Sequence, residues 1–140
     1  TIEIIKKYGK IPLVGCYPGQ INQVFMNLLA NALDALEEQN EKCSYEEILA
    51  NPSKIWIYTE VIRKNWITIR ITDNGLGMSE AVRSKLFDPF FTTKPVGKGT
   101  GLGLSISYQI VTIKHNGRLY CNSEVGQGAE FVVEIPINQN

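Results

Sequence analysis

At 140 residues the chain has the length of one domain, enough to bury a single hydrophobic core. Hydrophobic residues make up 44% and charged residues 20% of the sequence, a composition that argues against wholesale disorder. The 14 basic and 14 acidic residues cancel, which argues against nucleic acid as a partner, because proteins that bind phosphate backbones carry a basic excess.

The three cysteines, Cys16, Cys43 and Cys121, are odd in number and lack Cys-x-x-Cys spacing. They therefore predict neither a disulfide framework nor a zinc site, and they suit a reducing cytosol. No apolar run approaches the roughly 18 residues that a membrane span needs, and the N-terminus shows no signal pattern. We expect a soluble cytoplasmic domain, although a longer parent protein can still be membrane-anchored.

The first part of the chain predicts two edge strands and a long helix. Residues 1–8 and 11–17 are short β-branched-rich stretches divided by Gly9. Pro18 suits a first helical turn, and apolar residues recur with the helical period from Ile21 to about Gln39.

A short helix and a hairpin follow. The segment 38–53 is polar, but Ser44 and Glu47 form a capping-box pattern, which predicts a short helix in a surface insertion. Residues 55–62 and 66–73 alternate in polarity and predict an antiparallel hairpin.

In the second half, Ser79 can cap a short helix over 80–86, and 87–100 is a long loop without periodicity. The stretch 102–115 predicts a helix that ends at Asn116-Gly117, although its β-branched content leaves a strand open. Its apolar face is expected to comprise Ile106, Ile110 and Ile113.

Residues 118–123 and 129–135 alternate around a turn with Gly126 and Gly128 and predict a second hairpin. The element order predicts one α/β domain over 1–140. We expect a two-layer sandwich whose mixed, mostly antiparallel sheet is covered on one face by helices.

Between Val24 and Leu36 the polar residues are Asn27, Asn31 and Asp34, which fall within about 60° of one another on the helix. A helix that is apolar on almost every other side should be buried, so this stripe should face a hydrogen-bond network or a liganded cavity. The two readings are about equal here. Asparagine oxygens one turn apart would suit Mg²⁺.

Asp73 ends the second strand of the first hairpin and shares its face with Ile67, Ile69 and Ile71, so its carboxylate should point toward the core. It can simply form an Asx turn, or it can accept a hydrogen bond from an adenine amino group. Gly75 and Gly77 would then let the backbone approach the base.

The glycine-rich run 97–104 leads straight into a predicted helix, where free backbone N–H groups suit phosphate oxygens. A flexible linker is the alternative, but linkers favour Ser and Gly over the Gly/Leu alternation seen here. The spacing matches neither the P-loop nor the dinucleotide fingerprint.

Together these patterns resemble the ATP-binding domain of histidine kinases, a member of the Bergerat-fold superfamily that includes gyrase and mismatch-repair ATPases. Asn27-Leu-Leu-Ala-Asn31-Ala resembles the N box and Asp73-Asn-Gly-Leu-Gly-Met78 the G1 box. Phe87-Asp-Pro-Phe-Phe-Thr-Thr-Lys94 resembles the F box and Gly99-Thr-Gly-Leu-Gly-Leu104 the G2 box. Four blocks in the family's order make coincidence improbable.

The resemblance implies a role for each block. Asn31 and Asn27 would hold Mg²⁺, and Asp73 would bind adenine beside Gly75 and Gly77. The loop 87–100 would be the ATP lid. The residues expected near the phosphates are Thr92, Lys94, Lys98, Gly99, Thr100, Gly101, Leu102, Gly103 and Leu104. Lys94 and Asn27 would be catalytic, and Phe90 and Phe91 would anchor the lid or dock the phosphoacceptor helices.

Hydrolysing relatives carry a glutamate that activates water at the position occupied here by Asn27, which cannot serve as a general base. The resemblance therefore implies transfer of the γ-phosphate of Mg-ATP to a histidine on a separate dimerisation domain, and indirectly service to a response regulator. His115 corresponds to a structural turn, and the acceptor helices are absent, so we expect the isolated chain to be a monomer that does not phosphorylate itself. A nucleotide-binding regulatory module and a serine kinase of the same fold are the alternatives.

Overall fold

The computed structural model describes residues 2–91 and 102–138. The strands in that part of the chain are β1 (Glu3–Tyr8), β2 (Lys54–Ile62), β3 (Trp66–Asp73), β4 (Arg118–Ser123) and β5 (Ala129–Pro136). The helices are α1 (Pro18–Glu41), α2 (Tyr45–Ala50), α3 (Glu80–Arg83) and α4 (Gly103–Gln109), which continues as the π-helix η1 (Ile110–Lys114).

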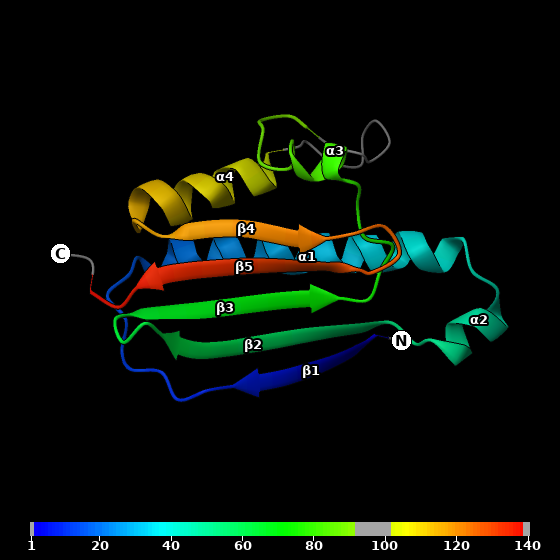
Figure 1. Cartoon of the computed structure of the whole chain (residues 1–140), viewed down its shortest axis with the longest axis horizontal. Coiled ribbons are helices and arrows are strands. Elements are labelled where there is room, and N and C mark those ends of the chain that lie inside the picture. The colour runs from blue at the N-terminus through cyan, green and yellow to red at the C-terminus, as the bar shows by residue number, and fades with distance from the viewer. Residues whose placement is uncertain (1, 92–101, 139–140) are drawn as a thin grey trace.

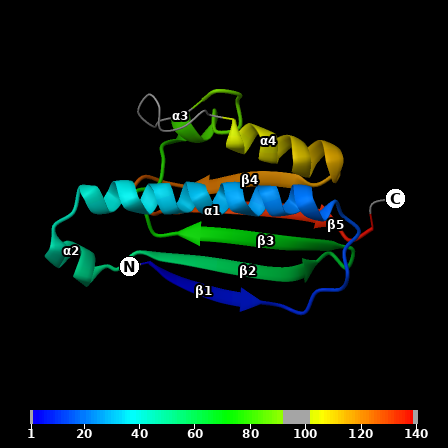
Figure 2. The same cartoon turned by 180° about the vertical axis from the view of Figure 1, so that it is seen from behind.

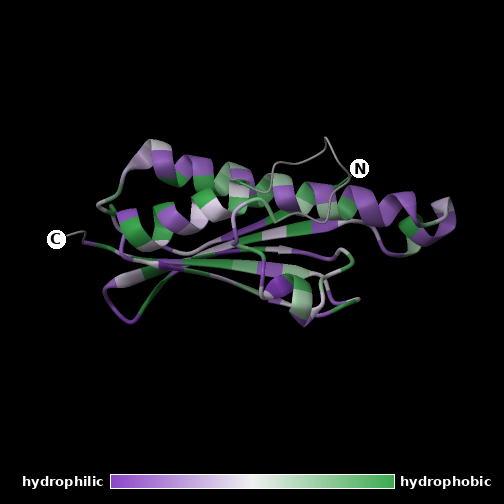
Figure 3. Ribbon diagram, turned by 90° about the horizontal axis from the view of Figure 1, so that it is seen from above, coloured by the Kyte–Doolittle hydropathy of each residue, from purple (hydrophilic) through white to green (hydrophobic). Residues whose placement is uncertain are grey.

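The strands form one sheet in the order β1-β2-β3-β5-β4 (Figure 1). The β1–β2 pair is parallel and the other neighbouring pairs are antiparallel, as predicted for a mixed, mostly antiparallel sheet. Helices α1 and α4 cover one face of the sheet, so the molecule has two layers (Figure 3). The predicted sandwich is therefore confirmed.

The core lies between α1 and the central strands. The buried side of α1 comprises Ile21, Val24, Leu28, Ala32 and Leu36. These residues pack on the inward-facing side chains of β3 and β5, which are Ile67, Ile69, Ile71, Phe131, Val133 and Ile135. Full burial of such side chains stabilises the fold by about 1.5–3 kcal/mol each, so this contact holds α1 firmly on the sheet.

Polar pairs hold the opposite face of the sheet, which no helix of the described residues covers. Glu130 accepts from Arg70 at 3.1 Å, and Glu134 accepts from Arg63 at 3.1 Å and from the Tyr120 hydroxyl at 3.1 Å. Such cross-strand pairs suit a surface that keeps contact with water.

Most predicted elements are present with nearly the predicted bounds. The long helix, both hairpins and the capped α2 are confirmed, and in α2 the Ser44–Glu47 capping box is formed in both directions. None of the residues of α2 is buried, which agrees with a surface insertion. The helix predicted over 80–86 is shorter, because α3 ends at Arg83.

The predicted strand over 11–17 is wrong. Pro12 lacks a backbone N–H, and the segment is held by separate bonds instead of a ladder: the Gly15 N–H donates to the Ile137 carbonyl at 2.9 Å, and the Tyr17 N–H donates to His115 Nε2 at 3.0 Å. The segment 11–17 is therefore a loop that connects β1 to α1 and is held in place by these two hydrogen bonds.

The predicted apolar face of the last helix is confirmed at Ile110, which is 7% exposed, and is wrong at the other two isoleucines. Ile106 and Ile113 are 37% and 69% exposed, whereas Ser105, Ser107 and Val111 are buried. Small serine side chains let α4 approach α1 closely, and the π-helical turn changes the direction of the residues that follow it.

Helix α1 is not enclosed on all sides either, since Met26 is 58% and Leu33 is 41% exposed. Figure 2 shows the reason: α1 runs along the outside of the sheet, and strands β1 and β2 lie beside it without a helix of their own. None of the helices in the described ranges is both long and apolar enough to span a membrane.

Candidate functional site

The polar stripe of α1 meets the start of α4. Asn27 Nδ2 donates to the Gly103 carbonyl at 3.1 Å and to Ser107 Oγ at 3.1 Å, across 76 and 80 residues of sequence. Asn27, Asn31 and Asp34 are each half-buried, as expected for a stripe that faces neither the core nor open water. The structure thus brings the predicted N-box and G2-box residues together.

The end of β3 meets the same side of α1 two turns further on. Asp73 is 3% exposed, and its Oδ1 accepts from the Gly75 N–H at 2.8 Å. A Cβ added at Gly75 would lie 2.9 Å from that oxygen and 3.6 Å from Ala35 Cβ. Gly75 therefore has no side chain because Asp73 and α1 leave no room for one.

One face of α1 thus joins the two halves of the candidate site. Asn27, Asn31 and Ala35 follow one another at four-residue steps, so Asn31 lies between the α4 contact and the Asp73 contact. At 1.5 Å per residue, the row from 27 to 35 is about 12 Å long. Asn31 and Asp73 therefore lie on the same side of the fold.

Asp73 is a buried carboxylate with an altered affinity for protons. Burial raises the pKa of Asp73 above its usual range, and the N–H groups of Gly75 and Ala129, which stabilise the charged form, oppose that rise. The Asp73 carboxylate can therefore accept a hydrogen bond from a ligand group that binds beside α1.

Gly77 is constrained by its own backbone conformation and packing. Its φ is +71°, and an added Cβ would lie 2.1 Å from the Glu124 carbonyl oxygen and 2.9 Å from that of Gly128. The residue is therefore a glycine because the loop packs directly on the β4–β5 turn.

Two residues that hold this loop were missed by sequence reasoning. Ser123 Oγ accepts from the Met78 N–H at 3.0 Å and donates to the Gly128 carbonyl at 2.6 Å. Asn74 accepts from the Lys54 N–H at 2.8 Å and donates to the Pro52 carbonyl at 3.0 Å. Neither residue had a local sequence signal. Three of these bonds join segments at least 20 residues apart, and the fourth, from Ser123 to Gly128, lies within one turn.

The glycine-rich run is described in part. Leu102 precedes α4, Gly103 is its first residue, and Leu104 packs on the core, so the predicted helix start after the glycines is confirmed. The predicted site residues Thr92, Lys94, Lys98, Gly99, Thr100 and Gly101 lie outside the described residues.

The donor set suits a hard cation. Asn27 Nδ2 faces both the Gly103 carbonyl and Ser107 Oγ, and no bond to its Oδ1 is found within residues 2–91 and 102–138. An amide oxygen in this setting suits Mg²⁺, whose other ligands can be phosphate and water. No group of three His, Cys, Asp or Glu side chains gathers in those two ranges, so they offer no metal cluster of the zinc type.

His115 has a structural place, as the sequence predicted. It is fully buried, its Nδ1 bonds to the Ile110 carbonyl at 2.9 Å, and its Nε2 accepts from the Tyr17 N–H. Because both ring nitrogens are used, the ring has no free position for phosphorylation.

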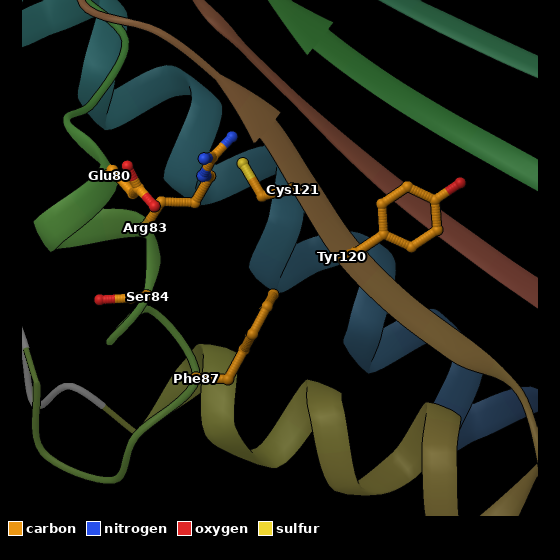
Figure 4. A pocket seen from close by; sticks show the side chains of 6 residues that line it. All are labelled: Glu80, Arg83, Ser84, Phe87, Tyr120 and Cys121. Carbon is orange, nitrogen blue, oxygen red and sulfur yellow. The ribbon is translucent and has the colours of Figure 1, made fainter.

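A separate cavity of about 260 Å³ lies beside α3 and the edge strand β4 (Figure 4). Its lining residues are Glu80, Arg83, Ser84, Phe87, Tyr120 and Cys121. Burial raises the pKa of Cys121 to about 12, so its thiol stays protonated and is a poor nucleophile. Its lining includes Phe87, the first residue of the predicted lid, but neither Asn27, Asn31 nor Asp73.

Known proteins share both the sequence pattern and the fold. Residues 17–139 match the family described as histidine kinase-, DNA gyrase B-, and HSP90-like ATPase. Sporulation kinase E of Bacillus subtilis (strain 168) is 35% identical over 130 residues, which are 93% of this chain and 15% of that protein. Sensor kinase CckA of Brucella abortus (strain 2308) is 40% identical over 119 residues, which are 84% of this chain and 12% of that protein. The chain thus spans a small part of these relatives.

Among solved structures, the nucleotide-free catalytic domain of histidine kinase ThkA is similar with a TM-score of 0.77 and 30% identity, covering 98% of this chain and 81% of that one. ThkA in complex with the response regulator protein TrrA is similar with a TM-score of 0.70 and 27% identity, covering 97% of this chain and 34% of that one.

Proposed function

The chain belongs to the family of histidine kinase-, DNA gyrase B- and HSP90-like ATPases, and within that family it is an ATP-binding domain of the sensor histidine kinase type. From this we propose that its site transfers the γ-phosphate of Mg-ATP to a histidine on a separate dimerisation domain. The observation that carries the proposal is the single face of α1 that contacts α4 at Asn27 and the Asp73 loop at Ala35. Its length of about 12 Å suits a nucleotide that lies along the helix.

In this proposal Asp73 accepts a hydrogen bond from the adenine amino group, and Gly75 and Gly77 keep the loop backbone beside the base. Asn27 and Asn31 would hold Mg²⁺, which would supply positive charge against the phosphates. The N–H groups from Gly99 to Leu104 bind phosphate oxygens at the start of α4. Thr92, Lys94 and Lys98 lie near the γ-phosphate, and Lys94 stabilises its charge during transfer.

Transfer is favoured over hydrolysis because Asn27 cannot take a proton from water. The site lowers the barrier by holding the phosphates and the incoming imidazole in line. Phe90, which is 72% exposed, is a docking residue for the helices that carry the histidine. A response regulator then receives the phosphoryl group, and the domain works as a cytoplasmic monomeric unit of a larger kinase.

Nucleotide binding is tested with Asp73→Asn. The exchange removes the charge that accepts the adenine amino group, and loss of a charged hydrogen bond corresponds to at least about a tenfold weaker affinity. Calorimetric titration of Mg-ATP would measure the change, with Glu46→Gln on the exposed surface of α2 as the control. An unchanged affinity in Asp73→Asn would contradict the adenine assignment.

Phosphotransfer is tested by adding a separately produced acceptor domain and γ-labelled ATP to the chain. The expected product carries an acid-labile, base-stable label on histidine, and the chain alone stays unlabelled. An acid-stable label would indicate a serine kinase. Tight nucleotide binding without any label would indicate a regulatory module that switches a partner.

A further inference from the structure

We propose that Ser107 is the positioning residue that turns the side-chain amide of Asn27, so that its oxygen and not its nitrogen faces the Mg²⁺ of the bound nucleotide. The inference rests on the proposed function, because it assigns a direction to a residue of the same site. None of the sequence patterns pointed to Ser107, which lies in the second turn of α4 after the glycine-rich run.

Three groups form a closed triangle at the contact between α1 and α4. Ser107 Oγ donates to the Gly103 carbonyl at 2.9 Å. Asn27 Nδ2 lies 3.1 Å from that carbonyl oxygen and 3.1 Å from Ser107 Oγ. Ser107 is fully buried, so water does not compete for its hydroxyl group.

The triangle permits one orientation of the amide. A carbonyl oxygen can only accept, so the Gly103 carbonyl takes the hydroxyl hydrogen of Ser107 and one hydrogen of Asn27 Nδ2. The hydroxyl has then used its hydrogen, and toward Asn27 it can only accept. A reversed amide would set Asn27 Oδ1 against the Gly103 carbonyl oxygen. It could bond to Ser107 only if the hydroxyl gave up its own bond to that carbonyl, so the reversal costs at least one buried hydrogen bond.

The orientation matters because the two ends of an asparagine amide are nearly equal in size but opposite in chemistry. Mg²⁺ takes oxygen ligands, and an amide nitrogen has no lone pair to offer it. With Nδ2 held by α4, Oδ1 is left for the cation. Ser107 thus acts on the metal through Asn27 without touching it.

The test compares the Mg²⁺ dependence of ATP affinity in Ser107→Ala with that of the wild-type chain. For each variant, the dissociation constant is measured with Mg²⁺ and with excess EDTA, and the ratio of the two constants is recorded. Loss of one net hydrogen bond predicts a benefit from Mg²⁺ that is about three- to tenfold smaller in Ser107→Ala. Both constants come from one preparation, so any unfolded fraction cancels in the ratio.

Thr112→Ala is the matched control. Thr112 makes the same kind of bond one helical repeat later, from its hydroxyl to the Tyr108 carbonyl at 2.7 Å, but on the side of the helix that faces β4. Its removal is expected to leave the ratio unchanged. Ser107→Thr keeps the hydroxyl and is expected to restore the ratio to within about twofold of the wild-type value. In an Asn27→Ala background, Ser107→Ala is expected to have no further effect.

A second readout needs neither nucleotide nor metal. The side-chain NH₂ resonances of Asn27 should exchange slowly with water in the wild-type chain and at least about tenfold faster in Ser107→Ala, because Nδ2 loses its bond to Ser107 Oγ. Equal weakening of ATP binding with and without Mg²⁺, or unchanged exchange, would overturn the positioning role. Failure of the wild-type chain to bind ATP at all, with slow exchange intact, would instead remove the proposed function.

Discussion

At the scale of single residues, Asp73 combines two properties that oppose each other. Its side chain is almost fully buried at the end of β3, and burial disfavours the charged form that the proposed contact with adenine needs. The N–H groups of Gly75 and Ala129 recover part of the lost hydration. A charge kept in such a place is typical of a residue retained for binding and not for stability.

This conflict predicts a pH-dependent effect of Asp73→Asn on stability. Because the folded-state pKa is raised, native Asp73 holds its proton at pH values where the unfolded carboxyl has already lost it. The contribution of Asp73 to stability is therefore largest below the ordinary carboxyl pKa and falls as the pH rises through the raised one. The unfolding free energy of Asp73→Asn, relative to wild type, should improve as the pH rises from below the ordinary carboxyl pKa of about 4 to well above it.

Urea denaturation of both proteins across that pH range measures the difference. The exposed variant Glu46→Gln should follow the wild-type curve closely. A difference between Asp73→Asn and wild type that stays constant with pH would show that burial of the charge has no energetic consequence.

At the scale of elements, the loop after β3 and the β4–β5 turn act as one unit. Gly77 lies against the Glu124 and Gly128 carbonyls, and the Gly126 N–H donates to the Leu76 carbonyl at 2.6 Å. Ser123 closes the contact from the strand side. The loop that carries Gly75 is therefore placed by the second hairpin as well as by β3.

Alanine variants of two glycines can distinguish the destabilisation caused by steric overlap from that caused by the backbone conformation. Gly77 and Gly126 both have positive φ, at +71° and +81°, but an added Cβ meets nothing within 4 Å at Gly126. We expect Gly126→Ala to lower the free energy of unfolding by about 1–2 kcal/mol. Gly77→Ala should cost about 2–4 kcal/mol, because steric overlap is added, and it should also weaken ATP binding. Chemical denaturation compares the two; equal losses would show that the loop can move away from the turn.

Elements governed by local rules could be predicted from the sequence. Helical periodicity located α1, the Ser44–Glu47 pattern located α2, and alternation located both hairpins, since each signal lies within the element itself. The position of Asp73 on the buried face of β3 followed from the same two-residue period.

Features set by distant contacts could not be predicted. The segment 11–17 looks like a strand, but its N–H groups bond to residues near the other end of the chain. The isoleucines of 102–115 suggested a buried face, yet the close approach to α1 needed the smaller Ser107. The triangle at Asn27 joins residues 76 and 80 positions apart, so no local pattern marks it.

At the scale of the whole molecule, His115 ties the entry to α1 to the helix that begins at the glycine-rich run. Its ring bonds to the Ile110 carbonyl in η1 and to the Tyr17 N–H just before α1, and it stacks edge-on with the Tyr17 ring at 5.4 Å. The α4–η1 helix is therefore joined to α1 near both of its ends, by Asn27 at its start and by His115 just after its last residue.

His115→Ala should remove this second joint. The exchange leaves two buried backbone groups without partners and opens a cavity, so we expect the unfolding free energy to fall by about 2–4 kcal/mol. Hydrogen exchange should show faster opening at the Tyr17 amide, while the exposed Lys114→Ala control stays close to wild type. Loss of phosphohistidine formation in a folded His115→Ala protein at saturating ATP would contradict a structural role.

Because Asn27, Asn31 and Ala35 occupy successive turns of one helix, α1 fixes the distance and the relative direction of the two ends of the site. Each extra residue would rotate everything beyond it by about 100°, so a one-residue insertion between 27 and 35 should separate the base end from the phosphate end. The neighbouring excursion 41–52 is closed at its base by the mutual hydrogen bonds of Asn40 and Ser53, at 3.1 and 3.3 Å, and none of the residues of α2 is buried. A fluorescent reporter or an affinity tag inserted at α2 should therefore be tolerated, although α1, which directly precedes this excursion, should not tolerate one added residue between 27 and 35.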